Sequence, residues 1–200
     1  MKYALLLFAL WFSTYPVGAA QDDATALVKR VADQMLSTLQ RERTRIERDP
    51  RRIYRLVEDQ LVPHFDFEKI TRAAVGRYWR QATPAQRQRL IEAFRQVLVR
   101  TYAQTLLKYS GQQIRYFPAK PGRRRGTVTV STEVREAGGP PIPVDYRMVW
   151  KGNAWKVYDV VIDHVSLVAN YRHSFQNQIH RQGIDGLIDR LQAMNRGGAS

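Results

Sequence analysis

The order of two hydrophobic periodicities is the feature that most limits how this chain can fold. From Asp22 to Gly111, apolar residues recur at steps of three and four, the spacing of amphipathic helices. From Gln112 to Ile162 they alternate with polar residues, the spacing of half-buried strands, and helical spacing then returns to about Met194. A block of helices followed by a block of strands predicts an α+β fold rather than an alternating α/β one.

The clearest single element begins at "TPAQ", residues 83–86. Thr83 is a good N-cap, Pro84 suits the first helical position, and Gln86 completes a capping box. The sequence predicts a helix from there to about Gly111, roughly 39 Å long. Its apolar stripe needs a long partner, so we expect this helix to lie across the apolar face of a sheet. The stripe includes Phe94, Val97, Leu98, Tyr102 and Leu106.

Two earlier stretches also have helical spacing. Residues 49–76 read as two shorter helices broken near Pro63, with Asp49 and Asp66 as caps. Residues 24–40 form another helix, whose apolar face contains Leu27, Val31, Met35 and Leu39.

The strand block predicts about four antiparallel strands in a curved sheet wrapped by several helices. "TVTVSTEVR", residues 127–135, alternates cleanly, so one face of the sheet meets water. Residues 144–162 read as a hairpin that turns at Gly152 and Asn153, and residues 112–117 add an edge strand. Wide apolar residues are in excess on the long helix and the strands. They either fill an ordinary core or line a cavity.

The first 20 residues have the layout of a secretory signal peptide, with Lys2, an apolar run over residues 3–12, Pro16 and small residues at 18–20. The apolar run is too short to span a bilayer. We expect cleavage after Ala19 or Ala20 and export to a bacterial periplasm. The predicted organisation is a signal peptide (1–20), one domain (21–196) and a flexible tail (197–200). The chain has no cysteine, so neither a lipid anchor on Cys nor a disulfide framework is expected.

The chain is strongly basic, with 32 Lys and Arg against 18 Asp and Glu and a formal net charge of +14. Such a balance often indicates nucleic-acid binding, but export argues against that partner. In a periplasm the available anionic partners are phospholipid head groups and acidic protein surfaces. Arg123, Arg124 and Arg125 are candidates for docking or head-group attraction, and an inert solvated turn is an equal alternative.

No motif for catalysis or metal binding stands out. Asp159, Asp163, His164 and Ser166 are close in sequence, but neighbours on a strand point to opposite faces and do not match a triad. The histidines lack metal-ligand spacing, and no glycine-rich phosphate loop is present. We therefore predict no catalytic residue, no metal and no cofactor.

Two alternatives to a ligand-binding protein stay open. A cone-shaped α+β enzyme of the isomerase or hydrolase kind, acting on an apolar small molecule, would use Asp145 or Asp159 as a general base and Tyr146 or Tyr158 as a donor. Asp145 falls on the wet face of its strand, and Asp159 is better placed to brace the following helix. The other alternative is a non-catalytic periplasmic adaptor that binds proteins through its basic surface.

Four short motifs occur together and carry a family resemblance: "ATPAQR" at 82–87, "W-x-V-Y-D-V" at 155–160, "V-S-L-V-x-N-Y-R" at 165–172 and "G-I-D-G-L-I" at 183–188. With them, nearly the whole predicted mature chain resembles the MlaC-type periplasmic phospholipid-binding proteins, also described as toluene-tolerance auxiliary proteins. Members of that family show Glu-Gly before the Val-Ser pair, where this chain has Asp163 and His164. Histidine does not reach every backbone region that glycine does, so the resemblance does not settle the local turn.

The resemblance implies a curved sheet wrapped by helices around an apolar cleft, which holds the acyl chains of a phospholipid while the head group stays at the solvent edge. It also implies a shuttle, in the pathway of outer-membrane lipid asymmetry, between an outer-membrane lipoprotein associated with porins and an inner-membrane ABC transporter with its lipid-transfer subunit. We expect a monomer. Matching positions imply a cleft lined by Ile142, Val144, Tyr146, Met148, Val165 and Val168.

The apolar stripe of the long helix adds further candidates for the cleft wall, which come from helical spacing and not from the resemblance. We also expect Asn170, Tyr171 and Arg172 to anchor their helix rather than to face a head group. The candidates from the stripe are Phe94, Val97, Leu98, Tyr102 and Leu106.

Overall fold

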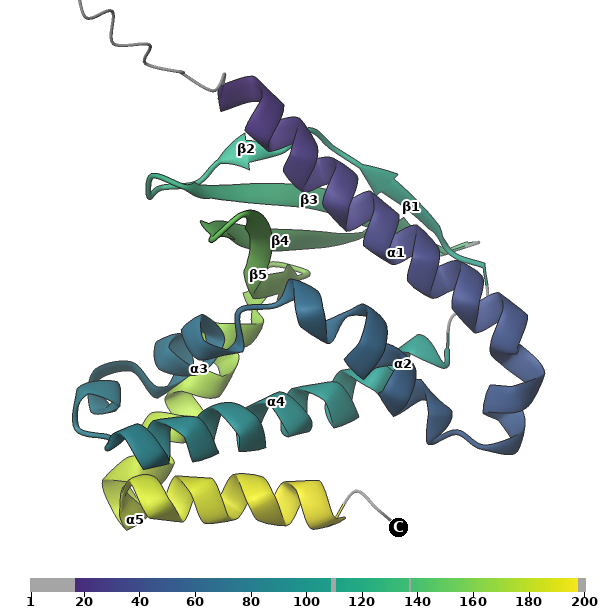
Figure 1. Ribbon diagram of the computed structural model, residues 1–200. Helices are drawn as coiled ribbons and strands as arrows, with labels where there is room; N and C mark the ends of the chain where they lie inside the picture. The colour runs from purple at the N-terminus through teal and green to yellow at the C-terminus, as the bar shows by residue number, and fades with distance from the viewer. Residues whose placement is uncertain (1–16, 109–110, 137, 198–200) are drawn as a thin grey trace, which may run out of the picture.

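The computed structural model describes residues 17–108, 111–136 and 138–197, and most of the predicted signal peptide and tail lie outside them. Helices and strands follow in the predicted order, so the α+β prediction is confirmed (Figure 1). Among the described helices, none has an apolar stretch long enough to cross a membrane. The main elements are α1 (Val17–Arg48), α2 (Arg52–Gln60), α3 (Phe67–Val75), α4 (Pro84–Leu106), β1 (Gln113–Tyr116), β2 (Lys120–Pro121), β3 (Thr127–Arg135), β4 (Ile142–Lys151), β5 (Ala154–Ile162), β6 (Val165–Ser166) and α5 (Leu167–Gly197).

Helix α4 begins as predicted and ends a little earlier, at Leu106. The Thr83 hydroxyl accepts a hydrogen bond from the Gln86 N–H (3.2 Å), and the Gln86 side-chain oxygen accepts one from the Thr83 N–H (3.0 Å). Asp66 caps α3 by accepting the Lys69 N–H at 3.1 Å. Helix α4 packs against α5, α2 and α3. The prediction that it lies across the sheet is therefore wrong, and α1 takes that place.

Helix α1 divides its length between two partners. Near its start Ala24 and Val28 are buried against the sheet, and the Thr25 hydroxyl accepts a hydrogen bond from the Ala119 N–H at 3.1 Å. Further along, α1 runs past the sheet and packs on α2 and α4 (Figure 1). The residues that it buries there are Met35, Leu39 and Ile46.

The sheet is antiparallel, with the spatial order β1-β3-β4-β5-β6, and β2 also pairs with β3. A β-bulge shifts the register between β4 and β5, because Arg147 pairs with Asp159 whereas Met148 pairs with Val157. Tyr158 is therefore an extra residue, and the side chains of β5 change phase at this point. The face that α1 covers is called the inner face below. On β5 it carries Trp155 and Val157 before the bulge, and Val160 and Ile162 after it.

The outer edge of β5 is paired at two places. Strand β6 pairs with it at Val161 and Ile162, and Phe65 forms an isolated parallel bridge with Val157. The Asp66 N–H donates a hydrogen bond to the Val157 carbonyl at 2.9 Å. The segment before α3 and the segment after β5 thus share this edge.

Asp163 and His164 form the two-residue turn between β5 and β6. Their φ angles are positive, 47° and 65°, and the turn closes the pair formed by Ile162 and Val165. Asp and His enter this region more readily than most residues that carry a side chain, whereas glycine enters it freely. The turn therefore forms without glycine, with backbone strain at His164.

Replacing His164 by glycine should raise the free energy of unfolding by about 1 kcal/mol, because a Cβ at positive φ is the source of the strain. Urea denaturation of the purified protein measures this change. His164→Ala is the matched control, since it removes the imidazole and keeps the Cβ, and it should bring no gain. If alanine and glycine raised the free energy of unfolding equally, the imidazole ring and not the backbone conformation would be the source of the destabilisation.

The described residues bury their apolar side chains in three clusters. The helical core joins α3, α4 and α5, the sheet core lies between the inner face and α1, and the corner core joins α1, α2 and α4. Phe65 packs against both the helical core and the sheet core, so it links them. Phe94 is fully buried in the helical core, Met148 in the sheet core and Met35 in the corner core.

Candidate functional site

The inner face of the sheet is apolar along its length, and α1 covers only part of it, because Trp150 at the end of β4 is 47% exposed. Under the start of α1, Met148 is 1% exposed and Trp155 is 5% exposed. At the other end Ile142 is 38% exposed, Ile162 is 39% exposed and Val165 is 60% exposed. These side chains are apolar and all lie on the same face of the sheet. Ile142, Ile162 and Val165 are therefore exposed because none of the described helices packs over them, not because the face becomes polar.

Strand pairing places the exposed residues Ile162 and Val165 side by side, with Val144, which is only 8% exposed, next to them. Val144 pairs with Ile162, and Ile162 pairs with Val165, so the three form a row across β4, β5 and β6. Ile142 lies on the same face two residues before Val144 and pairs with Val134 of β3. Ile142, Val144, Ile162 and Val165 are called the open end of the inner face below. A contiguous apolar surface of this kind marks a binding site more often than a solvated surface.

Tyr146 and Thr132 place two hydroxyls between the open and the covered end. Thr132 is buried, and its hydroxyl donates a hydrogen bond to the Val144 carbonyl at 3.1 Å. Burial raises the pKa of the Tyr146 phenol, and a hydrogen bond with Thr132 partly offsets that rise. The phenol is therefore neutral at physiological pH, and the middle of the inner face carries no charge.

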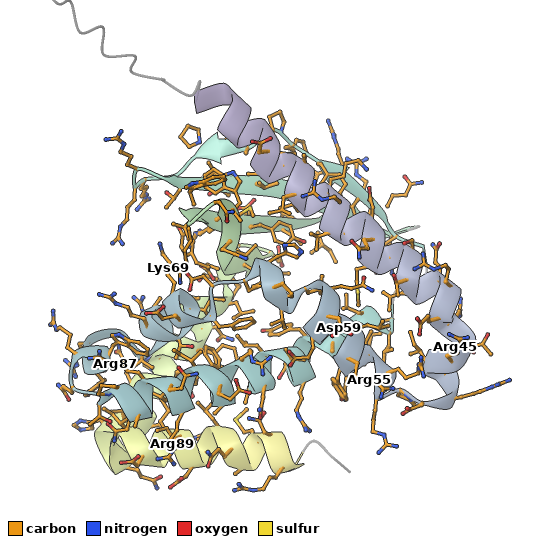
Figure 2. The ribbon with its side chains drawn as sticks, in the orientation of Figure 1. Arg45, Arg55, Asp59, Lys69, Arg87 and Arg89 are labelled. Carbon is orange, nitrogen blue, oxygen red and sulfur yellow. The ribbon has the colours of Figure 1, made fainter. Side chains whose placement is uncertain are left out.

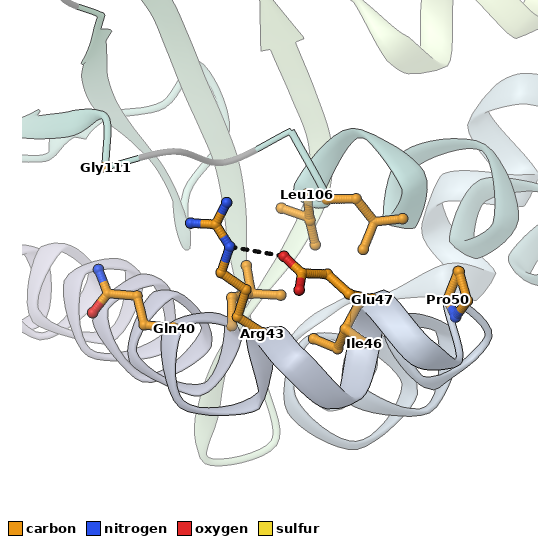
Figure 3. Close-up of a pocket in the computed structure, with 9 residues that line it drawn as sticks. Gln40, Arg43, Ile46, Glu47, Pro50, Leu106 and Gly111 are labelled. Carbon is orange, nitrogen blue, oxygen red and sulfur yellow. Dashed lines mark hydrogen bonds and ion pairs between the residues drawn. The ribbon is translucent and has the colours of Figure 1, made fainter.

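A cavity of about 350 Å³ lies between the second half of α1 and the end of α4, within the size range of small-molecule sites (Figure 3). Arg43 and Glu47 form an ion pair of 3.1 Å beside it and point from α1 toward the end of α4. The cavity also borders Gly111, two residues before β1. The rest of its lining consists of Leu39, Gln40, Ile46, Pro50, Leu106 and Leu107.

A second cavity, of about 380 Å³, lies beside the start of α3 and the hairpin of β4 and β5. Its charged groups already have partners. The Lys151 ammonium binds the Asp66 carboxylate at 3.1 Å, and the Lys156 ammonium donates to the Pro63 carbonyl at 2.6 Å.

Asp159 ties the sheet to the start of α5. It is 5% exposed, and its carboxylate accepts hydrogen bonds from the Ser166 hydroxyl (2.7 Å), the Val168 N–H (3.1 Å) and the Arg147 guanidinium (3.0 Å). Both carboxylate oxygens are thus engaged in holding the helix, which does not suit the general-base role of the enzyme alternative. In the described part of the chain, no group of three or more His, Cys, Asp or Glu is placed to hold a metal ion.

Tyr171 and Arg172 anchor α5, as predicted. The Tyr171 ring packs edge-on against Phe94, with 4.9 Å between the ring centroids. The Arg172 guanidinium donates a hydrogen bond at 2.8 Å to the carbonyl of Ala73, near the C-terminal end of α3, where the helix dipole favours a cation. Asn170 is exposed.

A family model described as "MlaC protein" matches residues 29–193. The chain belongs to the MlaC family. The match runs from α1 to α5 and includes every strand of the sheet. One curated relative is the "intermembrane phospholipid transport system binding protein MlaC" of Haemophilus influenzae, 27% identical over 195 residues, which cover 95% of this chain and 91% of the relative.

Two further comparisons agree with this assignment to the MlaC family. The toluene tolerance protein Ttg2D of Pseudomonas putida is 29% identical over 162 residues, covering 80% of this chain and 74% of the relative. A solved structure of the phospholipid-binding protein of Ralstonia solanacearum, in complex with a phospholipid, has a TM-score of 0.80 at 34% identity. That likeness covers 89% of this chain and 99% of the other. The predicted family and fold are confirmed, and the curated relatives are named for binding and tolerance, not for a reaction.

The structure brings together the predicted cleft residues of the sheet and the first turns after it. Ile142, Val144 and Val165 belong to the open end, and Tyr146 and Met148 continue the same layer toward the covered end. Their spacing along β4 is two residues, so this grouping follows directly from the strand pattern.

The residues predicted from the helical stripe do not join that layer. Phe94, Val97 and Leu98 of α4 are buried in the helical core, and so is Val168 of α5. Tyr102 packs at the rim of this core, where burial raises the pKa of its phenol, so it is neutral at physiological pH. Leu106 alone of the predicted set lines the cavity between α1 and α4.

Sequence reasoning missed several residues of both surfaces. Ile162 belongs to the open end only because of the bulge at Tyr158, which simple alternation does not reveal. Leu39 lies on the predicted apolar face of its helix, a signal that identifies a buried stripe but not a cavity. Ile46 lies beyond the predicted helix of residues 24–40, and Leu107 lies within the predicted helix that ends near Gly111 but off its apolar stripe.

Replacing Asp159 by asparagine should lower the free energy of unfolding by about 1–3 kcal/mol, because the amide nitrogen cannot accept the hydrogen bonds that the carboxylate now accepts. Urea denaturation measures the loss. Asp163→Asn is the control, since Asp163 is exposed and asparagine tolerates its positive φ, and it should be close to neutral. Equal stability of the two variants would contradict the role given to Asp159.

Proposed function

We propose that this protein is a periplasmic phospholipid carrier that shuttles lipid between the outer and inner membranes. The observation that carries the proposal is the open end of the inner face, where Ile142, Ile162 and Val165 are 38% to 60% exposed in an apolar layer whose centre, at Met148, is buried. Fatty acyl chains match such a surface, because they need apolar contact and no polar partner. The names of the relatives and the phospholipid in the Ralstonia structure support the same cargo.

In this proposal the acyl chains lie along the inner face and the head group stays at the solvent edge. The cavity beside Leu106 takes part of the cargo, and at about 350 Å³ it is at the lower end of the range for ligand sites. The remaining length of the chains therefore lies against the sheet. Its wall consists of Ile142, Val144, Tyr146, Met148 and Val165, to which we add Ile162.

The helical residues of the predicted site join the wall only when α4 and α5 move apart. In the structure the two helices pack against one another, and the Phe94 and Phe175 rings meet edge-on with 4.8 Å between their centroids. Cargo that fills this space replaces contacts of the helical core with contacts to lipid. The residues concerned are Phe94, Val97, Leu98, Tyr102 and Val168.

The energetics suit a shuttle. At about 0.8 kcal/mol for each buried CH₂ group, two acyl chains are stabilised by on the order of 20 kcal/mol relative to water. Relative to a bilayer, the chains only exchange one apolar environment for another. The carrier can therefore hold lipid firmly in water and still release it to a membrane system with little net change in free energy.

The proposed organisation follows the same function. Residues 1–20 direct export, residues 21–196 form one lipid-binding domain that acts as a monomer, and residues 197–200 are a tail. The partners are an outer-membrane lipoprotein with its porin and an inner-membrane ABC transporter with its lipid-transfer subunit. The name of the Haemophilus relative, which places it in an intermembrane transport system, supports this assignment. Arg123, Arg124 and Arg125 are exposed in the turn before β3 and form a candidate docking point.

Protein purified from periplasm should carry phospholipid. Native mass spectrometry should show the chain with one or more added lipid masses, and organic extraction should release the same lipids, because apolar cargo stays bound in water. Protein that is empty in every preparation would contradict the carrier and leave the adaptor as the explanation. Turnover of an apolar small molecule that Asp159→Asn abolishes, with binding intact, would favour the enzyme.

Val165→Glu should abolish co-purifying phospholipid and leave the fold intact. Val165 is 60% exposed, so the change costs little packing, but it puts a charge in the apolar wall proposed for the acyl chains. Lipid per protein is measured by mass spectrometry, and folding by circular dichroism. Met194→Glu is the matched control, because Met194 is 47% exposed near the C-terminal end of α5, and its lipid content should stay unchanged. Full lipid content in Val165→Glu would show that the wall lies elsewhere.

A further inference from the structure

Two turns lie side by side at one end of the sheet. Residues 122–126 join β2 to β3, and Gly152 and Asn153 join β4 to β5. The Trp150 N–H donates a hydrogen bond to the Gly126 carbonyl at 2.9 Å, so the end of β4 lies directly beside the turn between β2 and β3. Figure 1 shows this first turn projecting beyond the end of β4.

The projecting turn is strongly basic. Between residues 118 and 132 the chain has four basic residues and no acidic one. All four are exposed, and within the described residues none of them forms an ion pair. Asp23, two residues before the α1 residue that contacts Ala119, lowers the local excess by one charge and does not cancel it. The four cations are Lys120, Arg123, Arg124 and Arg125.

The cations of the neighbouring hairpin, β4 and β5, already have partners. Lys151 and Lys156 bind Asp66 and the Pro63 carbonyl, as described for the second cavity. The Arg147 guanidinium binds the Asp159 carboxylate at 3.0 Å. The positive charge that has no partner at this end of the sheet is therefore concentrated in the projecting turn.

Trp150 adds an exposed aromatic ring beside this charge. It is 47% exposed, and its ring packs edge-on against Trp155, which is buried, with 5.3 Å between the ring centroids. The ring is thus held in place on one side and open to solvent on the other. Tryptophan is enriched where membranes meet water, because its ring is apolar and its N–H is polar.

We propose that this basic tip, defined by Lys120, Arg123, Arg124, Arg125 and Trp150, docks on an anionic bilayer surface. Cations near such a surface are attracted by its negative potential, and a tryptophan beside them settles among the head groups. A folded acidic protein would need a recess shaped to the projecting turn, whereas lipid head groups move aside for it. The tip therefore matches a bilayer better. The proposal concerns the outside of the molecule and does not require that the cargo is phospholipid.

Vesicle sedimentation tests the electrostatic part of the proposal. The protein should bind vesicles of phosphatidylcholine with about 30% phosphatidylglycerol, should bind pure phosphatidylcholine far more weakly, and should be released as NaCl rises from about 0.05 M to about 0.5 M. The triple change Arg123→Glu, Arg124→Glu and Arg125→Glu should weaken binding to the anionic vesicles by about tenfold or more.

The matched control reverses the same charge at three exposed arginines where α1 meets α2: Arg45, Arg48 and Arg55. Within the described part of the chain these three form no ion pair either, so their reversal breaks none. Figure 2 shows Arg45 and Arg55 on the side of the molecule away from the projecting turn. This control should weaken vesicle binding far less.

Equal losses in the two triple variants would overturn the proposal, because net charge and not the tip would then govern binding. Failure of the unaltered protein to bind anionic vesicles would overturn it as well and would favour an acidic protein as the partner. Circular dichroism confirms that each triple variant is folded. Phospholipid cargo is measured separately, so a carrier that does not bind vesicles, or an empty protein that does, distinguishes this proposal from the proposed function.

Tryptophan fluorescence tests whether Trp150 meets the bilayer. Trp79 and Trp155 are buried, so among the tryptophans that the structure describes Trp150 has the exposed ring. Emission should shift to shorter wavelength on anionic vesicles, and Trp150→Phe, which keeps an apolar ring, should remove the shift. A shift that persists in Trp150→Phe would assign the contact to another part of the molecule and overturn the tip.

Truncation of the ring tests its contribution to binding. Trp150→Ala should weaken sedimentation with anionic vesicles by about fivefold or more, because the apolar ring no longer enters the head-group region. Leu107→Ala is the matched control, since Leu107 is also an exposed apolar residue, and it should bind like the unaltered protein. Undiminished binding by Trp150→Ala would contradict the role given to the tryptophan.

Discussion

The arrangement of the elements depends on how far one long, straight helix can follow a shorter, twisted sheet. Helix α1 has 32 residues and is about 48 Å long, whereas strands of nine or ten residues span only about 30 Å. Adjacent strands also rotate relative to one another, so a straight helix follows the inner face for a limited distance. Helix α1 covers the sheet through Ala24 and Val28 and then turns its apolar stripe to α2 and α4. The open end of the inner face and the cavity beside α4 both result from this division.

The polar residues of the site are consistent with a surface made for apolar contact. The Tyr146 and Thr132 hydroxyls hydrogen-bond to one another, and Thr132 also hydrogen-bonds to the β4 backbone. Neither hydroxyl therefore needs a water molecule as a partner. The carboxylate of Asp159 faces the other side of the sheet, where it fixes the start of α5. Charge is thereby kept off the inner face and used where it positions a helix.

Much of the fold could be predicted because its signals are local. The capping box at Thr83 and Gln86, the alternation of β3 and the hairpin turn at Gly152 each depend on a few neighbouring residues. The partner of each helix could not be predicted in this way. An apolar stripe shows which face of a helix is buried but not against what, and both α1, with 32 residues, and α4, with 23, carry such a stripe. The prediction from the sequence therefore put α4 across the sheet, where the structure has α1.

Prediction of the site residues from the sequence has the same limit. Ile142, Val144, Tyr146 and Met148 share a face at two-residue spacing, and the structure keeps them together. Ile162 could not be found by that rule, because the extra residue Tyr158 reverses the phase of β5. Bulges depend on the register of two strands, which the sequence of one strand does not contain.

The paired outer edge of β5 has a consequence for the behaviour of the protein in a crowded compartment. An uncovered strand edge is a template on which other chains add strands, and this leads to aggregation. Strand β6 and the bridge between Phe65 and Val157 occupy hydrogen-bonding groups at two places along that edge. A molecule that exposes apolar side chains on its sheet is thereby protected against the addition of strands from other molecules at this edge.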